Sequence, residues 1–208
     1  MRTLDDYILG HIDEEGDLLA SLYRDAHVKL THPHMIAGHL QGRLLKMLCR
    51  IMRPKRVLEI GAYTGYATLC LAEGLDDDAL IYSVEKNDEL QPFTIPYIEQ
   101  SAYKNKIRLF WGEIEALFST FNETFDMVYI DADKRDYCRY YDLIFSSLPS
   151  GALILADNTL WAGKVLVDKP SDKQTLGIIA FNEKIKSDDR VEKVMIPVRD
   201  GLTLIWKK

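Results

Sequence analysis

Two segments of the sequence carry oxygen-bearing side chains next to apolar runs, in a pattern that suits a divalent cation. Asp131 ends the apolar segment Met127–Asp131, and Asp157 and Asn158 follow the segment Ala152–Ala156. Two carboxylates and one amide oxygen form a donor set that favours Mg²⁺, Ca²⁺ or Mn²⁺ over zinc or copper. Three protein ligands would leave coordination positions for water or for two substrate oxygens. Because Asp-Asn pairs also cap turns, a structural role for Asp157 and Asn158 is the alternative.

Lys134 lies three residues after Asp131 and could act as a base at such a site. A bound dication disfavours a neighbouring ammonium ion, so this lysine would give up its proton more readily. An isolated lysine is more often a solvated surface residue, and that is the alternative for Lys134. Tyr66 and Trp161 could form aromatic walls of the site, although packing in the core or in a lid would explain each of them equally well.

A glycine turn between an apolar segment and a helical pattern indicates a cofactor site. Gly61 and Gly65 bracket this turn, and glycine allows a positive φ and a close approach of the backbone to a ligand. Glu85 lies twenty residues after Gly65 (85 − 65), where an acid can accept both hydroxyls of an adenosine ribose. The spacing is not GxGxxG, so the carboxylates of Glu59 and Glu85 suit an adenosine cofactor without phosphate better than a dinucleotide. A plain strand-to-helix connection is the alternative.

The pattern of apolar residues predicts an open α/β sheet that positions these segments. Near-continuous apolar runs fit parallel strands that are buried on both faces, and helical patterns alternate with them. Ligands of such sheets bind beyond the carboxyl ends of the strands, so the three segments are expected to face one crevice. The predicted strands are Arg56–Ile60, Leu80–Glu85, Ile107–Trp111, Met127–Asp131, Ala152–Ala156, Val191–Val198 and Leu202–Lys207, of which the last two form an antiparallel hairpin pair.

The predicted helices form an N-terminal group and a group between the strands. Helices over Leu18–Leu30 and Ile36–Met52 precede the sheet, and Pro54 closes the second. Residues 1–208 are predicted to be a single domain, with residues 1–53 as a lid on the substrate side and residues 54–208 as the cofactor-binding core. Further helices are predicted to begin near Gly65, Asp88, Glu113 and Asp136, with a last one over Thr175–Lys186.

Composition and charge exclude several classes of protein. A length of 208 residues is enough for one well-buried domain. The formal net charge of -6 argues against a nucleic-acid partner, which needs clustered basic residues, so a small-molecule substrate is expected. No apolar run approaches the length that spans a bilayer, and the acidic start Met1–Tyr7 is no secretory signal. These features predict a cytoplasmic protein with no membrane partner.

The cysteines and histidines are interpreted as structural. Cys49, Cys70 and Cys138 are far apart, lack CxxC spacing and each lie in an apolar helical pattern, which indicates reduced packing residues. His32 and His34 could be imagined as metal ligands, but no acidic or cysteine partner accompanies them at ligand spacing. A loop near the mouth of the substrate site is the preferred interpretation.

Together these motifs resemble the cation-dependent class I O-methyltransferases, the group that contains catechol and caffeoyl-coenzyme A O-methyltransferases. The resemblance implies a Rossmann-like three-layer α/β fold with extra N-terminal helices, whose seven-stranded, mostly parallel sheet has an antiparallel last strand. It also implies a homodimer and a small aromatic hydroxyl compound as substrate. The similarity begins near Met35, and the segments that carry it are Leu58–Tyr66, Asp131–Lys134, Asp157–Trp161 with Gly163, Phe181–Asn182 and Asp200–Leu202.

The resemblance also implies roles for individual residues. The cofactor would be S-adenosylmethionine, and the metal Mg²⁺, or else Ca²⁺ or Mn²⁺. Asp131, Asp157 and Asn158 would hold the metal, Lys134 would be the base, and Lys134 and Asp131 would be the catalytic residues. The residues implied at the cofactor are Glu59, Gly61, Ala62, Tyr63, Ala67, Glu85, Ile114 and Asp133. The chain departs from its relatives at Ala67, where many have serine, at Ala37, where plant relatives have threonine, and at Leu40–Arg43, where Glu-Gly-Gln is usual.

Two other functions stay open at this point. A nucleotide-dependent oxidoreductase could use a similar sheet and would bind NAD(H). A non-catalytic cofactor-binding protein could keep the same fold after losing its activity. The presence of Lys134 together with all three predicted metal ligands favours the methyltransferase.

Overall fold

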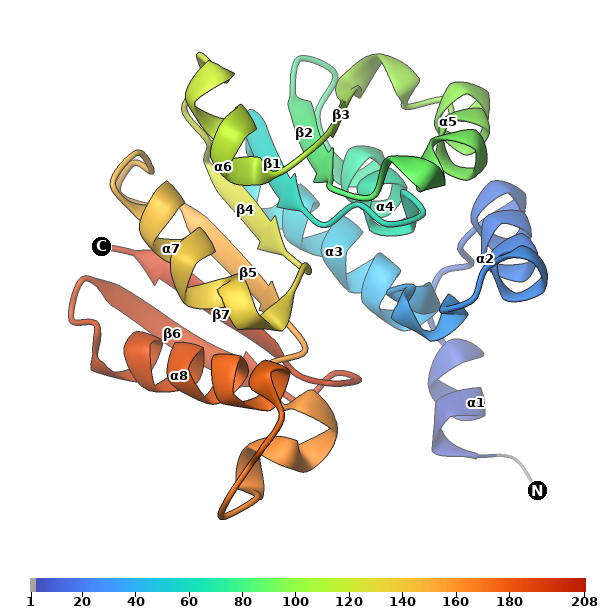
Figure 1. Cartoon of the computed structure of the whole chain (residues 1–208). Helices are drawn as coiled ribbons and strands as arrows, with labels where there is room; N and C mark the ends of the chain where they lie inside the picture. The colour runs from blue at the N-terminus through green and yellow to red at the C-terminus, as the bar shows by residue number, and fades with distance from the viewer. Residues whose placement is uncertain (1–2) are drawn as a thin grey trace. The chain divides into compact units, whose positions relative to one another are not determined.

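A computed structural model describes residues 3–208 of the chain, and its seven strands form one sheet in the order β3-β2-β1-β4-β5-β7-β6 (Figure 1). The pairs β1·β4, β2·β3 and β4·β5 are parallel, whereas β7 runs antiparallel to both β5 and β6. The predicted mostly parallel sheet with an antiparallel last strand is therefore confirmed. The strands are β1 (Arg56–Ile60), β2 (Leu80–Glu85), β3 (Ile107–Trp111), β4 (Met127–Ile130), β5 (Leu153–Asp157), β6 (Val191–Ile196) and β7 (Leu202–Lys207).

Helices precede the sheet and connect most of its strands. The α-helices are α1 (Leu4–Leu9), α2 (Asp17–Lys29), α3 (Gly38–Met52), α4 (Tyr66–Gly74), α5 (Gln91–Gln100), α6 (Ile114–Leu117), α7 (Tyr137–Phe145) and α8 (Lys173–Ser187). Short 3₁₀ segments include η1 (Pro33–Met35), η2 (Asp88–Leu90), η5 (Lys134–Asp136) and η6 (Trp161–Leu166). Within residues 3–208, no helix is both long and apolar enough to cross a membrane.

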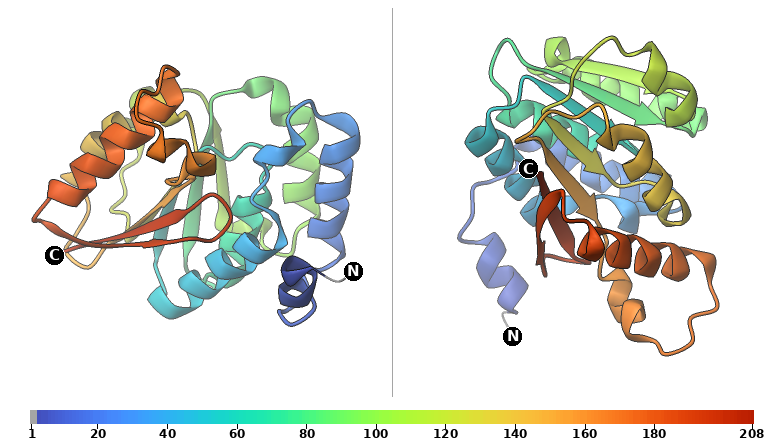
Figure 2. Two further views of the ribbon diagram at one scale, coloured as in Figure 1. Left: turned by 90° about the horizontal axis from the view of Figure 1, so that it is seen from below. Right: turned by 90° about the vertical axis from the view of Figure 1, so that its left-hand side faces the viewer.

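The chain divides into two compact units, which are described separately. The second unit consists of Arg56–Gly61 and Gly112–Lys208. In it, α7 and α8 lie side by side over one face of the strands (Figures 1 and 2). Strands β4 and β5 are buried along their whole length, as their apolar sequences predict.

The first unit contains the residues up to Lys55 together with Ala62–Trp111. Its helices α3 and α4 pack closely because two glycines face the partner helix. A Cβ on Gly42 would lie 2.7 Å from Cys70 Sγ, and one on Gly74 would lie 2.5 Å from the carbonyl oxygen of Lys46. Helix α3 ends at Met52 because Arg53 adopts the left-handed conformation (φ 49°) and a proline follows.

The sequence patterns located most elements to within two residues. Strands β1, β2, β3 and β7 have the predicted bounds, whereas β6 ends at Ile196 and the helix expected from Glu113 is only the short α6. Helix α1 was not predicted. The last two strands form the predicted antiparallel hairpin pair, and β7 is also antiparallel to β5. Strand β5 is shifted by one residue, so Asp157 is its last residue and lies inside the buried strand.

The cysteines agree with the structural interpretation. Cys49, Cys70 and Cys138 lie in α3, α4 and α7, and all three are free thiols. Burial raises the pKa of the Cys49 and Cys70 thiols to about 12. Because a thiol reacts as its thiolate, both groups are poor nucleophiles.

Candidate active site

The register of three adjacent strands brings the acidic strand ends of the second unit together. Ile60 pairs with Ile130, and Ile130 pairs with Ala156. The next residue on each strand is therefore Gly61, Asp131 or Asp157, at the carboxyl end of β1, β4 or β5. Gly61 has a φ of 100°, and a Cβ there would collide with the carbonyl oxygen of Asp131. Only glycine allows β1 to leave the sheet this close to Asp131.

The carboxylate of Asp157 is held from two sides. Its Oδ1 accepts a hydrogen bond of 2.7 Å from the backbone N–H of Asn158. Its Oδ2 accepts one of 2.9 Å from the hydroxyl of Tyr129. Because one bond is made to each oxygen, the two together fix the orientation of the carboxylate. The alternative of a turn cap is partly correct, because Asp157 does bind the N–H of the next residue.

Asn158 turns the chain away from the sheet directly after Asp157. Its φ of 57° is left-handed, a conformation that asparagine tolerates better than most residues. The turn is fixed at Thr159, whose N–H donates to the carbonyl of Gly201 (3.0 Å) and whose carbonyl accepts from Asn182 Nδ2 (2.8 Å). The backbone that carries the Asn158 side chain is therefore held in place directly after Asp157.

Lys134 is a buried residue, so its interpretation as a solvated surface lysine is wrong. Its exposed fraction is 6%. Its Nζ donates hydrogen bonds of 2.7 Å to Asp131 Oδ1 and of 2.7 Å to the hydroxyl of Tyr137. The ammonium group is thus fixed beside one of the two strand-end carboxylates.

Tyr137 links Lys134 to the ends of β4 and β5. Its hydroxyl lies 3.1 Å from the carbonyl oxygen of Ile130 and 3.0 Å from that of Asp157. Burial, together with the nearby charges of Asp131 and Asp157, raises the pKa of Tyr137 well above its ordinary value. Burial and the same two charges also raise the pKa of Tyr129. Both phenols therefore stay neutral, and the charges of both carboxylates act on each of them.

The donor set fits a hard divalent cation. Asp131 and Asp157 offer carboxylate oxygens and Asn158 an amide oxygen, which is the ligand chemistry of Mg²⁺, Ca²⁺ or Mn²⁺. Among the described residues, no group of three or more His, Cys, Asp or Glu side chains could hold a metal ion. That finding does not bear on the set of Asp131, Asp157 and Asn158, because only two of its three members are of these residue types. It disfavours the histidine site considered at His32 and His34, whose rings lie 5.8 Å apart.

Four of the predicted cofactor residues belong to the second unit. Glu59 and Ile114 are buried, Glu59 in β1 and Ile114 at the start of α6. Gly61 provides the close approach described above. Asp133 caps η5 and accepts hydrogen bonds from the backbone N–H (3.1 Å) and Nε (2.8 Å) of Arg135. A ligand that binds Asp133 would therefore share it with the Arg135 guanidinium.

The other four predicted cofactor residues, Ala62, Tyr63, Ala67 and Glu85, lie in the first unit. The Glu85 carboxylate at the end of β2 accepts 2.8 Å bonds from the backbone N–H groups of Tyr63 and Asn87, so it ties the glycine turn to the strand. Tyr63 has a positive φ of 48° in that turn, and Ala62 and Ala67 are buried. Tyr66 is only 1% exposed and bonds to Glu15, so it is a packing residue and no wall of a site.

Sequence reasoning missed Tyr129 and Tyr137. A signal for Tyr129 exists, because it precedes Asp131 by two residues and strand residues two apart share a face. Tyr137 follows Lys134 by three residues, a spacing that places neighbours on one side of a helical turn. Both fit the apolar pattern of their elements, because a tyrosine ring packs like that of phenylalanine, and this pattern alone predicts only a core position.

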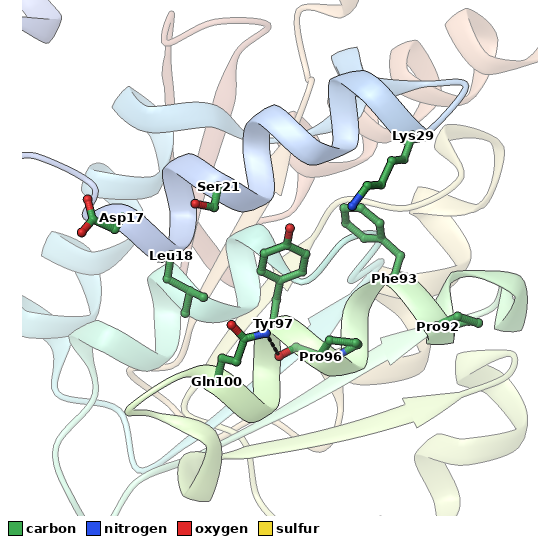
Figure 3. Close-up of a pocket in the computed structure, with 9 residues that line it drawn as sticks. All are labelled: Asp17, Leu18, Ser21, Lys29, Pro92, Phe93, Pro96, Tyr97 and Gln100. Atoms are coloured by element: carbon green, nitrogen blue, oxygen red, sulfur yellow. Dashed lines mark hydrogen bonds between the residues drawn. The ribbon is translucent and has the colours of Figure 1, made fainter.

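A cavity of about 510 Å³ in the first unit lies between α2 and α5 (Figure 3). Leu18, Phe93 and Tyr97 form much of its wall, with Asp17 and Lys29 toward opposite ends. None of the predicted site residues lines it.

Comparison with known proteins identifies the chain's family. A family model described as O-methyltransferase matches residues 11–208. The caffeoyl-CoA O-methyltransferase of Petroselinum crispum is 35% identical over 176 residues, 79% of this chain and 73% of that protein. The enzyme of the same name from Populus kitakamiensis is 33% identical over 175 residues, 79% of this chain and 74% of that protein.

Solved structures share the fold. The O-methyltransferase TomG of Streptomyces achromogenes, in complex with SAM, superimposes with a TM-score of 0.90 at 24% identity, covering 99% of this chain and 96% of that one. An O-methyltransferase of Bacillus cereus, in complex with SAH, gives 0.90 at 24% identity, covering 99% and 97%.

The chain belongs to the O-methyltransferase family. This membership confirms the class of enzyme predicted from the sequence, an S-adenosylmethionine-dependent O-methyltransferase. It disfavours the oxidoreductase considered above.

Proposed function

We propose that the protein transfers a methyl group from S-adenosylmethionine to a hydroxyl of a catechol-like or other vicinal-dihydroxy aromatic molecule, and that the reaction depends on a divalent cation. The observation that carries this proposal is the pairing of β4 with β5, with Asp131 and Asp157 next in register and the buried Lys134 bonded to Asp131. The relatives named for caffeoyl-CoA support an aromatic hydroxyl acceptor.

Asp131, Asp157 and Asn158 would hold the cation. When bound, it would supply Lewis-acid stabilisation to a phenolate, which matters because an unperturbed phenol ionises only near a pKa of ~10. Lys134 would take the proton of the acceptor hydroxyl, and Asp131 would keep the lysine in reach. The nucleophilic oxygen then forms a bond to the methyl carbon as the bond from that carbon to sulfur breaks, so orientation by the protein contributes much of the catalysis.

The residues predicted from the sequence are proposed to bind the cofactor. Glu85, with its orientation fixed by two backbone N–H groups, is proposed to accept the ribose hydroxyls. Glu59, Gly61, Ala62, Tyr63, Ala67, Ile114 and Asp133 are proposed as further contacts. Residues 1–53 are proposed to cover the acceptor side, and the protein is proposed to act as a homodimer.

Calorimetric titration with S-adenosylmethionine, with and without Mg²⁺, tests the cofactor, and a titration with NADH serves as the negative control. A panel of catechols, flavonoids and acyl-coenzyme A phenols, assayed by methyl transfer, then identifies the acceptor. Product should form only when a divalent cation is present. Undiminished turnover in EDTA would contradict the cation dependence while leaving the methyltransferase itself intact.

A further inference from the structure

Two tyrosine hydroxyls reach into the strand-end cluster, and the proposed reaction gives neither of them a role. Tyr129 on β4 bonds to Asp157 Oδ2 at 2.9 Å, and Tyr137 on α7 bonds to Lys134 Nζ at 2.7 Å. Both side chains are fully buried. Phenylalanine would fill the same space, so the hydroxyls call for an explanation beyond packing.

We propose that Tyr129 and Tyr137 are positioning residues with separate tasks. Tyr129 orients the carboxylate of Asp157 for the cation, and Tyr137 holds Nζ of Lys134 beside Asp131. This proposal rests on the proposed function, because it assigns tasks to the cation site and to the base of that reaction.

The task of Tyr129 follows from the register of β4 and β5. Tyr129 pairs with Leu155, so its side chain lies on the same face as those of Asp131 and Asp157, which come two residues later on their strands. Its hydroxyl extends forward to Asp157 Oδ2, while the N–H of Asn158 holds Oδ1. Without the hydroxyl, Asp157 Oδ2 loses this hydrogen bond. Hydrogen-bond partners of this kind orient metal ligands and raise metal affinity.

The task of Tyr137 follows from how Lys134 is held. The backbone of Lys134 is fixed by α8, since a Cβ on Gly177 would collide with the carbonyl oxygen of Lys134 and the Cα of Arg135. The long side chain still has many rotamers, and ordering them costs free energy. The Tyr137 hydroxyl selects one of these rotamers by accepting a bond from Nζ. The Tyr137 hydroxyl is held in turn by the backbone carbonyls of Ile130 and Asp157. The position of the lysine is therefore fixed relative to the ends of β4 and β5.

The Tyr137 ring has packing partners that a phenylalanine would keep, and Tyr129 is buried along with the rest of β4. The ring of Tyr137 meets that of Phe181 edge to face at 5.4 Å, and Lys134 Nζ lies 4.9 Å from the Tyr137 ring centroid. Tyr137→Phe and Tyr129→Phe therefore remove little more than a hydroxyl. Tyr141 provides a matched control on α7: it is also buried, and its hydroxyl bonds to Asp188 at 2.9 Å, not to any residue of the cluster.

The experiment compares Tyr129→Phe, Tyr137→Phe and Tyr141→Phe with the wild-type chain. Mn²⁺ binding is measured by calorimetry, kcat and KM are measured at saturating Mn²⁺ with whichever of catechol or caffeoyl-coenzyme A the wild type methylates, and thermal unfolding is followed for each. Tyr129→Phe should raise the Kd for Mn²⁺ about tenfold to hundredfold. Tyr137→Phe should leave that Kd within about twofold and lower kcat by about tenfold to hundredfold, with KM for the acceptor unchanged. Tyr141→Phe should change neither quantity.

The outcomes separate this proposal from the one it rests on. If the wild type binds Mn²⁺ and methylates, but Tyr129→Phe and Tyr137→Phe behave like Tyr141→Phe, the positioning roles are wrong and the function stands. Equal loss of Mn²⁺ affinity in both variants would overturn the division of tasks. A wild type that neither binds Mn²⁺ nor methylates would overturn the function and this proposal with it. Unfolding temperatures shared with Tyr141→Phe exclude simple loss of folding as the cause.

Discussion

Within residues 3–208, each unit contains a buried cation paired with a partly buried carboxylate, and the two pairs differ in what they can do. In the first unit, the Arg43 guanidinium (8% exposed) bonds to Glu73 at 2.8 Å, and Lys46 bonds to the other Glu73 oxygen at 2.7 Å. In the second unit, Lys134 bonds to Asp131 and to a phenol. Arginine stays charged, whereas lysine can release a proton. Only the second pair therefore offers a side chain that could serve as the proposed base.

The Arg43 pair is a structural link between two helices. Glu73 lies on α4, and both of its cationic partners lie on α3. The two carboxylate oxygens are each taken by one cation. Asp157 accepts hydrogen bonds from two uncharged donors, the backbone N–H of Asn158 and the hydroxyl of Tyr129. The first cluster therefore joins two helices, whereas Asp157 lies at the end of β5, where a cation site is proposed.

The largest effect is expected from removing a proposed metal ligand. Asp157→Ala should abolish cation-dependent methylation, a loss of about a thousandfold or more, because Lewis-acid stabilisation of a transition state is worth several kcal/mol. Methyl transfer measured across Mg²⁺ concentrations tests this. Asp142→Ala, which removes an exposed carboxylate of α7 that pairs with Lys184, is the control and should retain full activity.

Replacing the lysine of each cluster by methionine gives the next largest effect. Lys134→Met should lower kcat by about 10²- to 10⁴-fold, the usual contribution of a general base. Lys46→Met removes a lysine bonded to Glu73 and should leave kcat unchanged. Steady-state assays of both variants at saturating cofactor decide the point. Equal activities would mean that Lys134 is a structural cation like Lys46.

Replacing Arg43 is expected to lower the stability of the protein and to leave kcat unchanged. Arg43→Met should lower the free energy of unfolding by about 3 kcal/mol, the lower end of the range for a broken buried pair, because Lys46 still contacts Glu73. Denaturant unfolding monitored by circular dichroism measures the change. At a temperature where the variant stays folded, its kcat should match that of the wild type. A variant with normal stability and lost activity would refute the structural role.

The smallest effect concerns the acid stability of the same cluster. Burial opposes ionisation of Glu73, but the hydrogen bonds from Arg43 and Lys46 outweigh it, and the pKa of Glu73 falls below its ordinary value. A lowered folded-state pKa stabilises the protein above the unfolded-state pKa, and the gain disappears as pH falls through the folded-state value. The wild type should thus lose stability relative to Arg43→Met over the acidic range below the ordinary glutamate pKa of about 4.3. A stability difference between the two proteins that stays constant across that range would contradict the lowered pKa of Glu73.

Much of the fold could be predicted because its signals are local. Apolar runs, flanked by Gly or Pro at β1, β3 and β7, marked β1, β2, β3 and β7 to the residue. The errors at β4 and β5 are of one residue, because an aspartate at a strand end is equally compatible with strand and loop by pattern alone. Helix α1 escaped notice because its apolar residues Leu4, Tyr7 and Leu9 are exposed, so no buried face produced a helical pattern.

The sequence by itself determined which residues could carry the chemistry, because oxygen ligands, a lysine and glycine turns are recognisable by type and spacing. Only the tertiary structure decided which of them meet. The register of β4 and β5 makes Asp131 and Asp157 neighbours, and Gly177 and Tyr137 fix Lys134 from elements later in the chain. The physical reason is that a hydrogen bond is made at about 3 Å, and only packing brings groups far apart in the sequence within that distance.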